Sequence, residues 1–422
     1  MDIDRVALPA AVAATVATLV VVFYYPVGSV LTAAVFRDGA LTLAPLADVL
    51  GDPFYTGVAH HLVTDPLGVP AGAVEWIKAG MPSVKTGLIG FTAWQATLSM
   101  IASVALGLPG AYLLARWEFP GRRTIRSLTL LPFVLPSIMV AVGFLAMFGR
   151  QGVVNDLLGA VGLGPVKLVF TLELVVIAHA FYNAPLVTRL VTTAWESVDR
   201  RRVETARTMG ASRFRAFLDV VVPQLLPALL TAALLTFVFT FMSFPIVLAL
   251  GGLQLATLEV WLYNRVQRLA LSEAATLGAI ETTLSLVLTY VYLRYEAVQV
   301  RAGQSGGGLP RTRLLARGRA LVDPRRLVLL AYAAVALVVF VGPLGSLLIE
   351  SVTGPDGGFT LQYYAFLLER QEGAAVGTTR PLTAIRNSLA FGTGTLVLAI
   401  PMGVAVSVVA TRDGRGSRLA EA

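Results

Sequence analysis

The sequence predicts an all-α fold, a polytopic helical membrane protein with about eight transmembrane helices. Two observations predict it. Of the 422 residues, 56% are hydrophobic and only 14% are charged, so too little polar surface exists to cover a water-soluble globule. The hydrophobic residues also gather in runs long enough to cross a bilayer as helices. Cysteine is absent, which excludes disulfides and thiolate metal sites.

Eight apolar runs have spanning length, and each predicts one helix. In chain order they lie near residues 7–31, 88–115, 127–148, 169–192, 223–250, 273–293, 327–349 and 383–410. The first run follows the N-terminal MDIDR directly, without a small-residue cleavage site. It is therefore interpreted as the first span rather than as a signal peptide.

Basic residues indicate which side each loop occupies. With the N-terminus in the cytoplasm, 23 of the 33 basic residues fall on the cytoplasmic side. They concentrate in segments 116–126, 200–215, 294–326 and 412–418. This distribution follows the positive-inside rule and predicts a multi-pass protein of the plasma or inner membrane. The net charge of +8 could suit nucleic acid, but the basic residues do not alternate with aromatic ones, so lipid headgroups are the expected contact and nucleic acid is not.

Two outer segments, 37–86 and 353–382, are too long to be simple turns and are expected to face a partner outside the cell membrane. The first contains acidic and histidine side chains, namely Asp48, Asp52, His60, His61 and Asp65. A His-His pair without ligand spacing is weak evidence for a metal site. Solvated loop histidines are the favoured interpretation, and no metal is expected.

The longest charge-dense segment between two apolar runs is 197–230. Its first part, Val198 to Thr208, suits a short helix, and Gly210 can take the left-handed conformation that ends it. Ser212 can cap a second helix from Arg213 to Val222, before Pro223 opens the next apolar run. The segment is therefore expected to form a helix, a bend and a helix along a membrane face.

The spacing of small, aliphatic and acidic residues in this segment resembles the cytoplasmic EAA loop, here 197–223, of binding-protein-dependent ABC importer permeases. The matching residues are Glu204, Thr205, Ala206, Gly210, Val220, Val222 and Pro223. Thr205 departs from the usual alanine. The resemblance implies a MetI-like ABC permease fold whose loop docks into a cytoplasmic ABC ATPase dimer and receives its closing motion. A loop that only joins two helices is the alternative.

Several residues that are costly in a bilayer lie inside the predicted spans. Pro132 and Pro136 interrupt the third span, and such breaks are tolerated where neighbours satisfy the freed backbone groups. His179, Asn183 and Glu281 are polar groups at membrane depth, so all five are candidates for a substrate path. His179 and Asn183 lie four residues apart, and a hydrogen-bonded pair that joins two spans is an equal alternative. Glu281 is expected to be neutral, paired or facing an aqueous cavity.

A closer resemblance covers roughly residues 90–290. The runs that carry it are Phe148–Gly152 with Asn155, His179–Pro185, Ser243–Pro245, Leu250–Gly252 and Ala256–Val260. They are similar to the two-half thiamine and ferric iron permease subfamily. The resemblance implies substrate delivery by an external binding protein, with thiamine as the first expectation and ferric iron as the alternative.

A short repeat suggests duplication. PVGSVL at 26–31 recurs as PLGSLL at 343–348, six spans later, so the two copies have the same orientation. The expected division is a first permease half at 1–293, a cytoplasmic linker at 294–326 with a flexible Gly303–Gly308, and an incomplete second half of two spans at 327–422. The second half would lack the counterparts of four spans of the first half. Either a truncated sequence or a second permease chain that supplies those spans would explain this.

Other mechanism classes fit less well. No G-x-x-x-x-G-K-[ST] loop occurs, so the chain is expected to be a transport subunit without its own ATPase site, and not an enzyme. No cofactor is expected. A secondary transporter should show buried acidic residues in both halves, and Glu281 has no visible counterpart. A membrane enzyme should show clustered catalytic residues, and three histidines leave little room for them.

Overall fold

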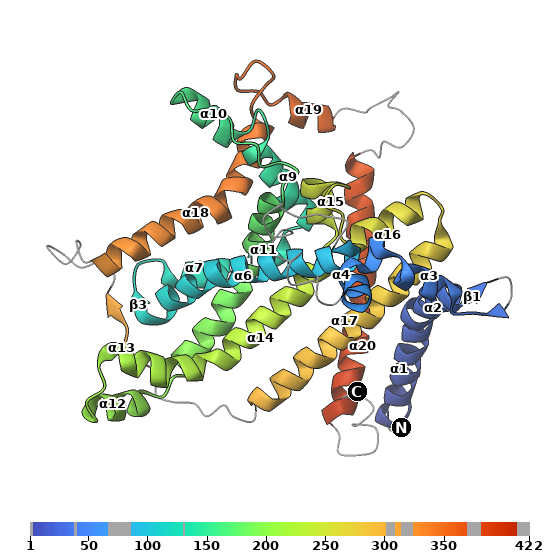
Figure 1. Ribbon diagram of the computed structural model, residues 1–422, viewed down its shortest axis with the longest axis horizontal. Coiled ribbons are helices and arrows are strands. Elements are labelled where there is room, and N and C mark those ends of the chain that lie inside the picture. The colour runs from blue at the N-terminus through green and yellow to red at the C-terminus, as the bar shows by residue number, and fades with distance from the viewer. Residues whose placement is uncertain are drawn as a thin grey trace. The chain divides into compact units, whose positions relative to one another are not determined.

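The computed structural model describes residues 3–37, 40–65, 86–129, 131–300, 309–313, 324–368 and 381–411. Long helices dominate this part of the chain, and its strands are two residues long (Figure 1). Eight helical segments within it are long and apolar enough to cross a membrane, with mean hydropathies from 1.4 to 2.6. The predicted all-α polytopic fold, and the predicted number of spans, are therefore confirmed.

The first span consists of α1 and α2, which are joined by the π-helical turn η1. Each of the other seven spans is identified below by the helix or helices that form it. The bounds are α1 (Ile3–Leu19), η1 (Val20–Tyr24), α2 (Tyr25–Val35), α6 (Gly87–Arg116), α9 (Ser137–Phe148) with α10 (Val153–Ala160), α11 (Leu172–Glu196), α14 (Val222–Phe241), α17 (Leu271–Val300), α18 (Pro324–Ser351) and α20 (Pro381–Thr411).

Shorter elements connect the spans. They are β1 (Phe36–Arg37), β2 (Ala40–Leu41), α3 (Ala44–Gly51), α4 (Pro53–Thr64), β3 (Trp117–Glu118), α7 (Arg122–Leu128), α8 (Leu131–Val134), α12 (Arg200–Thr208), α13 (Arg213–Ala216), η2 (Phe217–Val221), α15 (Pro245–Gly251), α16 (Leu258–Gln267), β4 (Thr312–Arg313) and α19 (Gln362–Leu368). Strands β1 and β2 pair antiparallel. Strands β3 and β4 pair parallel, so residues 309–313 of the predicted linker lie against the end of α6. Gly303–Gly308 lies outside the described residues.

The chain forms two compact units, one comprising residues 1–33 and 351–422 and the other residues 34–350. In the first unit α1 packs against α20. The second unit contains six spans, from α6 to α18. These units reflect packing and do not identify duplicated halves, so the division at residues 293 and 326 stays a prediction.

Helices α6, α11 and α14 form the centre of the second unit, and small residues let α6 and α11 approach closely. A Cβ atom at Gly107 would lie 2.6 Å from the Ala184 carbonyl oxygen and 2.8 Å from Val187 Cβ. Thr188 donates a hydrogen bond across this contact to the Gly107 carbonyl at 2.9 Å. Close backbone approach of this kind is how membrane helices gain packing energy without a hydrophobic driving force.

Helix α18 packs against the same group of helices. Tyr332 donates a hydrogen bond to the Leu106 carbonyl of α6 at 2.7 Å. A Cβ atom at Gly143 of α9 would lie 2.8 Å from the Pro343 carbonyl oxygen. The rings of Phe181 and Phe340 lie 5.6 Å apart. The seventh span is therefore part of the second unit's core.

Two predicted spans are wrong in their bounds, and proline explains both. The segment 127–148 is not one helix, because the chain leaves the helical conformation at Pro136, with ψ of 131°, and α9 begins only at Ser137. The segment 223–250 is also broken: α14 ends at Phe241 and α15 starts at Pro245. Proline has no N–H to donate inside a helix, so the helix is interrupted near it, and Pro245 lies instead in the first turn of α15.

Candidate functional site

The segment predicted to form a helix, a bend and a helix has that geometry. Asp199 caps α12 by accepting from the Arg201 backbone N–H at 2.9 Å, and Ser212 caps α13 by accepting from Arg215 N–H at 3.1 Å. Between them Gly210 has a φ of +93°, as predicted. We call residues 199–216, which comprise α12, the bend and α13, the coupling hairpin.

The second helix differs from its prediction. It does not stop at Val222 but continues from α13 through the π-helical η2 into α14. Pro223 therefore lies inside a continuous helix, where it has no N–H to donate to the preceding turn, and the π-helical turn η2 directly precedes it. As a consequence α13 is continuous with a membrane-spanning helix.

The inner face of the coupling hairpin is held by apolar packing against α6, α11 and α14. Trp195 at the end of α11 stacks on Phe217 with ring centroids 6.1 Å apart. Val203 of α12 packs on the same cluster, which includes the buried Val198 and Val221. Asp199 N–H also donates to Gln224 Oε1 of α14 at 3.1 Å. The hairpin is thus tied to three spans at their ends.

The outer face of the coupling hairpin is free of such packing. Met209 is 82% exposed and Phe214 is 71% exposed, although both are large apolar residues. Glu204 of α12 is also exposed and forms an ion pair of 2.5 Å with Arg200 one turn earlier. Neither Met209 nor Phe214 was singled out from the sequence, although apolar residues within a charge-dense segment were a usable signal.

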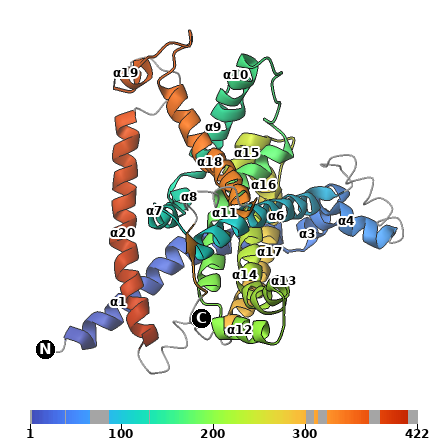
Figure 2. The same cartoon turned by 90° about the vertical axis from the view of Figure 1, so that its left-hand side faces the viewer.

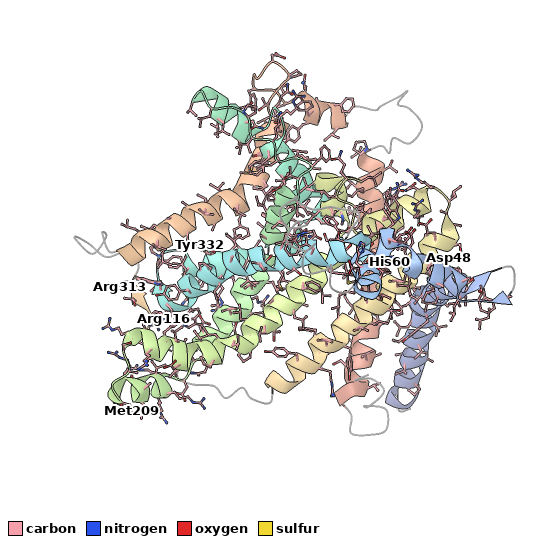
Figure 3. All side chains as sticks on the ribbon, viewed as in Figure 1. Asp48, His60, Arg116, Met209, Arg313 and Tyr332 are labelled. Atoms are coloured by element: carbon pink, nitrogen blue, oxygen red, sulfur yellow. The ribbon has the colours of Figure 1, made fainter. Side chains whose placement is uncertain are left out.

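The other residues of the predicted EAA pattern divide between the two faces. Thr205 is exposed and Ala206 half-buried, whereas Val220 and Val222 are half-buried in η2 and at the start of α14. Figures 1 and 2 both place α12 and α13 beside the end of α14. In Figure 3 Met209 and Arg116 lie at one end of the second unit, while Asp48 and His60 lie at the other.

A second candidate site lies in the interior, around His179 of α11. The His179 side chain is buried, and its Nδ1 lies 2.8 Å from Gln95 Nε2 and 3.0 Å from Ser99 Oγ of α6. Its Nε2 lies 2.8 Å from Ser243 Oγ, between α14 and α15. His179 therefore joins three elements through its ring.

The predicted side-chain pair of His179 and Asn183 is not formed. Asn183 instead donates to the His179 backbone carbonyl at 3.0 Å, within the same helix. Gln95 and Ser99, the actual partners of the ring, were missed, although their spacing of four places both on one face of an apolar helix. The ring of His179 does join its span to neighbouring elements by hydrogen bonding, as the alternative expected, but its partners are Gln95, Ser99 and Ser243.

The prolines of the third span show how a break is tolerated at this depth. Pro132 is buried in α8, and Pro136 is exposed between α8 and α9. The break frees the Leu135 carbonyl, and the Tyr182 hydroxyl of α11 donates a hydrogen bond to it. A neighbouring helix thus satisfies the backbone group, as interrupted membrane helices require.

Glu281 of α17 is buried among the spans. One of its carboxyl oxygens, Oε1, has no hydrogen-bond partner among the described residues. Its charged neighbour is Glu259, in the first turn of α16. A hydrogen bond between the two carboxyl groups requires a proton on one of them, so the pair carries at most one negative charge inside the helix bundle.

The outer histidines do not gather acidic ligands around them. Asp52 caps α4 by accepting from Phe54 N–H at 2.8 Å, and the His60 and His61 rings lie 6.1 Å apart on that helix. Within the described ranges no three histidine, aspartate or glutamate side chains come close enough to hold a metal ion.

Comparison with known proteins places the chain among transport permeases. The family model described as "binding-protein-dependent transport system inner membrane component" matches residues 107–299. The molybdenum transport system permease protein ModB of Azotobacter vinelandii is 30% identical over 213 residues, which cover 50% of this chain and 92% of ModB. The thiamine transport system permease protein ThiP of Brucella abortus (strain 2308) is 28% identical over 335 residues, 78% of this chain and 57% of ThiP.

The chain spans between 36% and 57% of the length of the thiamine permeases that it matches. A solved structure with a similar fold is that of a bacterial ABC transporter involved in the import of the acidic polysaccharide alginate. The similarity has a TM-score of 0.51 at 16% identity and covers 72% of this chain and 98% of the other. With these matches, the chain belongs to the family of inner membrane components of binding-protein-dependent transport systems.

Proposed function

We propose that the chain is the transmembrane permease of an ATP-driven importer, and that the coupling hairpin is the surface that receives a cytoplasmic ABC ATPase dimer. The observation that carries this proposal is the contrast between the two faces of the hairpin. Its inner face is packed on Trp195 and Phe217, while its outer face exposes Met209, Phe214 and Glu204. Exposed large apolar residues next to a charged one are the composition of a protein interface.

The attachment of the coupling hairpin to α11 and α14 suggests how a movement of the ATPase would be transmitted to the membrane spans. Since α13 continues into α14, and Phe217 stacks on Trp195 in the last turn of α11, a displacement of the outer face would move the ends of two spans with it. ATP would close the partner dimer and favour one of two arrangements of the spans, because the docked hairpin fits one arrangement better. The ATPase supplies the phosphate site, for which this sequence has no loop.

The proposed sidedness puts the coupling hairpin and the N-terminus in the cytoplasm. Arg116 and Met209 lie at the same end of the second unit in Figure 3, and α7, α12 and α13, which carry most arginines of segments 116–126 and 200–215, are drawn at that end in Figure 1. An excess of arginine is typical of the cytoplasmic side. The opposite end, with Asp48 and His60, would then receive an external substrate-binding protein.

We propose thiamine as the substrate. Support comes from relatives named as thiamine permeases, at 28% to 31% identity, and from Glu281. A buried carboxyl group with an unpartnered oxygen suits a cation. Thiamine carries a positively charged thiazolium ring. Among the five candidate path residues, Glu281 is therefore the one most directly supported. His179, Asn183, Pro132 and Pro136 would shape the path by holding the helices around it.

The test is uptake of radiolabelled thiamine into membrane vesicles that contain the chain with its ATPase and binding protein. Uptake should require ATP, and Glu281→Gln should lower it roughly 10-fold, the effect of about 1.4 kcal/mol of lost interaction. Glu173→Gln is the matched control, because Glu173 is exposed at the start of α11. Uptake of ferric iron in place of thiamine, or thiamine uptake without ATP, would contradict the proposal.

A further inference from the structure

A cavity of about 510 Å³ lies between α7 and α11, apart from the coupling hairpin and from the buried polar residues around His179. Its lining consists of Arg122, Arg123, Arg126, Ser127, Arg189 and Thr193. Four of these six residues are arginines, and none is acidic. We call it the arginine cavity. Its lining predicts an anionic ligand, because guanidinium groups present several N–H donors in a planar arrangement that matches phosphate oxygens.

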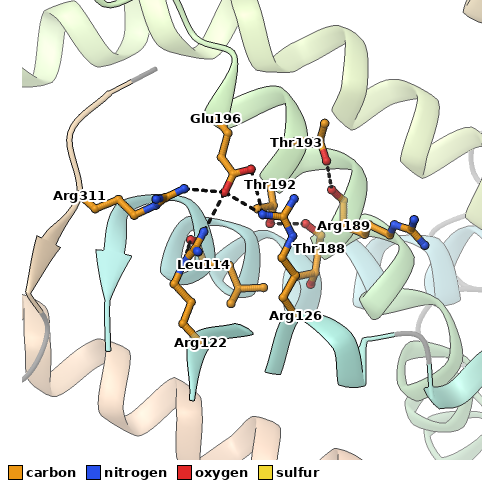
Figure 4. A network of polar contacts seen from close by, with 9 residues as sticks. All are labelled: Leu114, Arg122, Arg126, Thr188, Arg189, Thr192, Thr193, Glu196 and Arg311. Carbon is orange, nitrogen blue, oxygen red and sulfur yellow. Dashed lines mark hydrogen bonds and ion pairs between the residues drawn. The ribbon is translucent and has the colours of Figure 1, made fainter. Parts of the chain in front are cut away.

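Part of this positive charge is already neutralised by one carboxylate. Glu196, the last residue of α11, accepts from Arg122 at 2.8 Å, from Arg126 at 3.1 Å and from Arg311 at 2.9 Å (Figure 4). Arg122 also donates from Nε to the Leu114 carbonyl at 2.8 Å, which fixes its orientation. A single carboxylate shared by three guanidinium groups leaves a positive excess at the cavity.

The other two arginines of the lining are available to a ligand. Arg123 and Arg189 are exposed, and neither has an acidic side chain within ion-pair distance among the residues that the structure describes. Figure 4 shows Arg189 pointing away from Glu196. Thr193 and Ser127 donate their hydroxyl protons to the backbone carbonyls of Arg189 and Arg123, at 3.0 and 3.2 Å. The unpaired guanidinium groups therefore come from two different helices that border one cavity.

The surroundings of the cavity distinguish a lipid headgroup from a free phosphate. On α7 the apolar residues Ile125 and Leu128 alternate with the arginines and are 45% and 53% exposed. A short helix with exposed apolar side chains beside arginines is typical of the membrane interface, where the apolar groups contact acyl chains. Helix α7 begins six residues after the end of α6, so its arginines lie near the end of a span, at the headgroup level. A free phosphate would use the guanidinium groups but not Ile125 and Leu128.

The geometry points to a binding site for the phosphate headgroup of an anionic phospholipid in the arginine cavity. Basic pockets between membrane helices on the cytoplasmic side are suited to such headgroups. The lipid phosphate would bridge Arg123 of α7 and Arg189 of α11, and its acyl chains would lie against Ile125 and Leu128. The site adjoins Glu196, so a bound lipid would hold α7 against the helix end that leads into the coupling hairpin.

The experiment measures binding of phosphatidylglycerol to the full chain purified in detergent, with phosphatidylcholine and inorganic phosphate as separate arms. The wild type should bind phosphatidylglycerol saturably and phosphatidylcholine weakly. The double variant Arg123→Gln, Arg189→Gln should lose roughly 10- to 30-fold in affinity, because each arginine near a headgroup contributes on the order of a tenfold factor or less. Replacement of both arginines by lysine should keep the affinity closer to the wild-type value.

The matched control is Arg294→Gln, which changes an exposed arginine in the last two turns of α17, outside the cavity, and should bind as the wild type does. Thermal unfolding of each variant checks that the fold is retained. Unchanged phosphatidylglycerol affinity in the double glutamine variant would overturn the inference. Displacement of the lipid by millimolar inorganic phosphate would overturn it in favour of a free-phosphate site. Loss of ATPase association without loss of lipid binding would indicate a protein contact instead.

Discussion

The interface between α6 and α11 and the coupling hairpin belong to the same compact unit, but their side chains are used in opposite ways. At the interface the two backbones are so close that a Cβ atom at Gly107 would clash, and both ring nitrogens of His179 have hydrogen-bonding neighbours. In the hairpin one face is packed and the other exposes Met209 and Phe214. The comparison indicates that substitutions at the interface should change stability, and substitutions on the outer hairpin should change partner binding.

The largest effect is expected at Gly107. In Gly107→Val the new Cβ atom would meet the Ala184 carbonyl oxygen at 2.6 Å, and a backbone atom cannot move aside as a flexible side chain can. We expect a loss of roughly 3 kcal/mol or more in the free energy of unfolding, at or beyond the upper end of the usual cost of overpacking. Unfolding of the purified chain in mixed micelles measures it. Gly159→Val is the control, since a Cβ atom there meets nothing within 4 Å; an equal loss in both variants would disprove the close contact.

The next effect is expected at His179. His179→Leu removes the contacts of the ring with Gln95, Ser99 and Ser243, of which Gln95 and Ser99 keep their hydrogen bond to each other at 2.9 Å. With membrane hydrogen bonds contributing about 0.6 kcal/mol each on average, the loss should be about 2 kcal/mol. The same unfolding measurement applies, with His60→Leu in the outer helix α4 as control. Normal stability together with lost thiamine uptake would instead place His179 in contact with the substrate.

A smaller effect is expected at the bend of the coupling hairpin. Gly210 has open space around it, so Gly210→Val is unfavourable only because a β-branched residue resists a φ of +93°. The cost of about 1–2 kcal/mol is local and should weaken ATPase association roughly 10-fold while the unfolding midpoint of the spans stays the same. Ala211→Val adds the same side chain at the next position and should have little effect. Equal weakening in the two variants would show that the bend geometry is not what matters.

The smallest effect concerns pH and the outer helix α4. Tyr55 donates a hydrogen bond to Glu273, which forms an ion pair of 2.9 Å with Arg265. Burial, and the adjacent Glu273 carboxylate, raise the pKa of Tyr55 from 10.0 to about 12. Because the folded pKa is the higher one, the stabilising contribution of Tyr55 is complete below pH 10 and is lost as the pH rises to 12.

The measurement is the difference in Tm between the wild type and Tyr55→Phe across this range. The difference should shrink from pH 10 to pH 12. Tyr24→Phe, at an exposed position of the first span, should show no comparable change. A Tm difference that is constant with pH would mean that the Tyr55 hydroxyl is not held as described.

Features that depend on neighbouring residues were predicted well from the sequence. The eight spans follow from apolar runs, and the coupling hairpin follows from Gly210 and Ser212, a bend and a cap that act within a few residues. The break at Pro136 was expected, but the bounds of that span and the break before Pro245 were missed, because an apolar run continues across each break. Hydropathy locates an apolar run, but it does not locate the residues at which a helix begins and ends.

Features that depend on residues far apart in the chain were not predictable in this way. The partners of His179 lie 64 to 84 residues away in the sequence, and the contacts of Glu196 with Arg122 and Arg311 span 74 and 115 residues. A single sequence indicates that such a residue needs a partner but not which one. The packing of α18 on α6 and α9 was missed for the same reason.

The central claim is that the outer face of the coupling hairpin binds the ATPase, and Glu204→Lys tests it most directly. The measurement is the affinity of the purified ATPase for the chain in nanodiscs, together with the unfolding midpoint. Because Glu204 is exposed and pairs only with Arg200 among the described residues, the charge reversal should leave the midpoint unchanged. It should weaken ATPase binding by roughly 10-fold or more. Glu118→Lys, an exposed glutamate of β3, should bind normally. Wild-type affinity in Glu204→Lys would contradict the account.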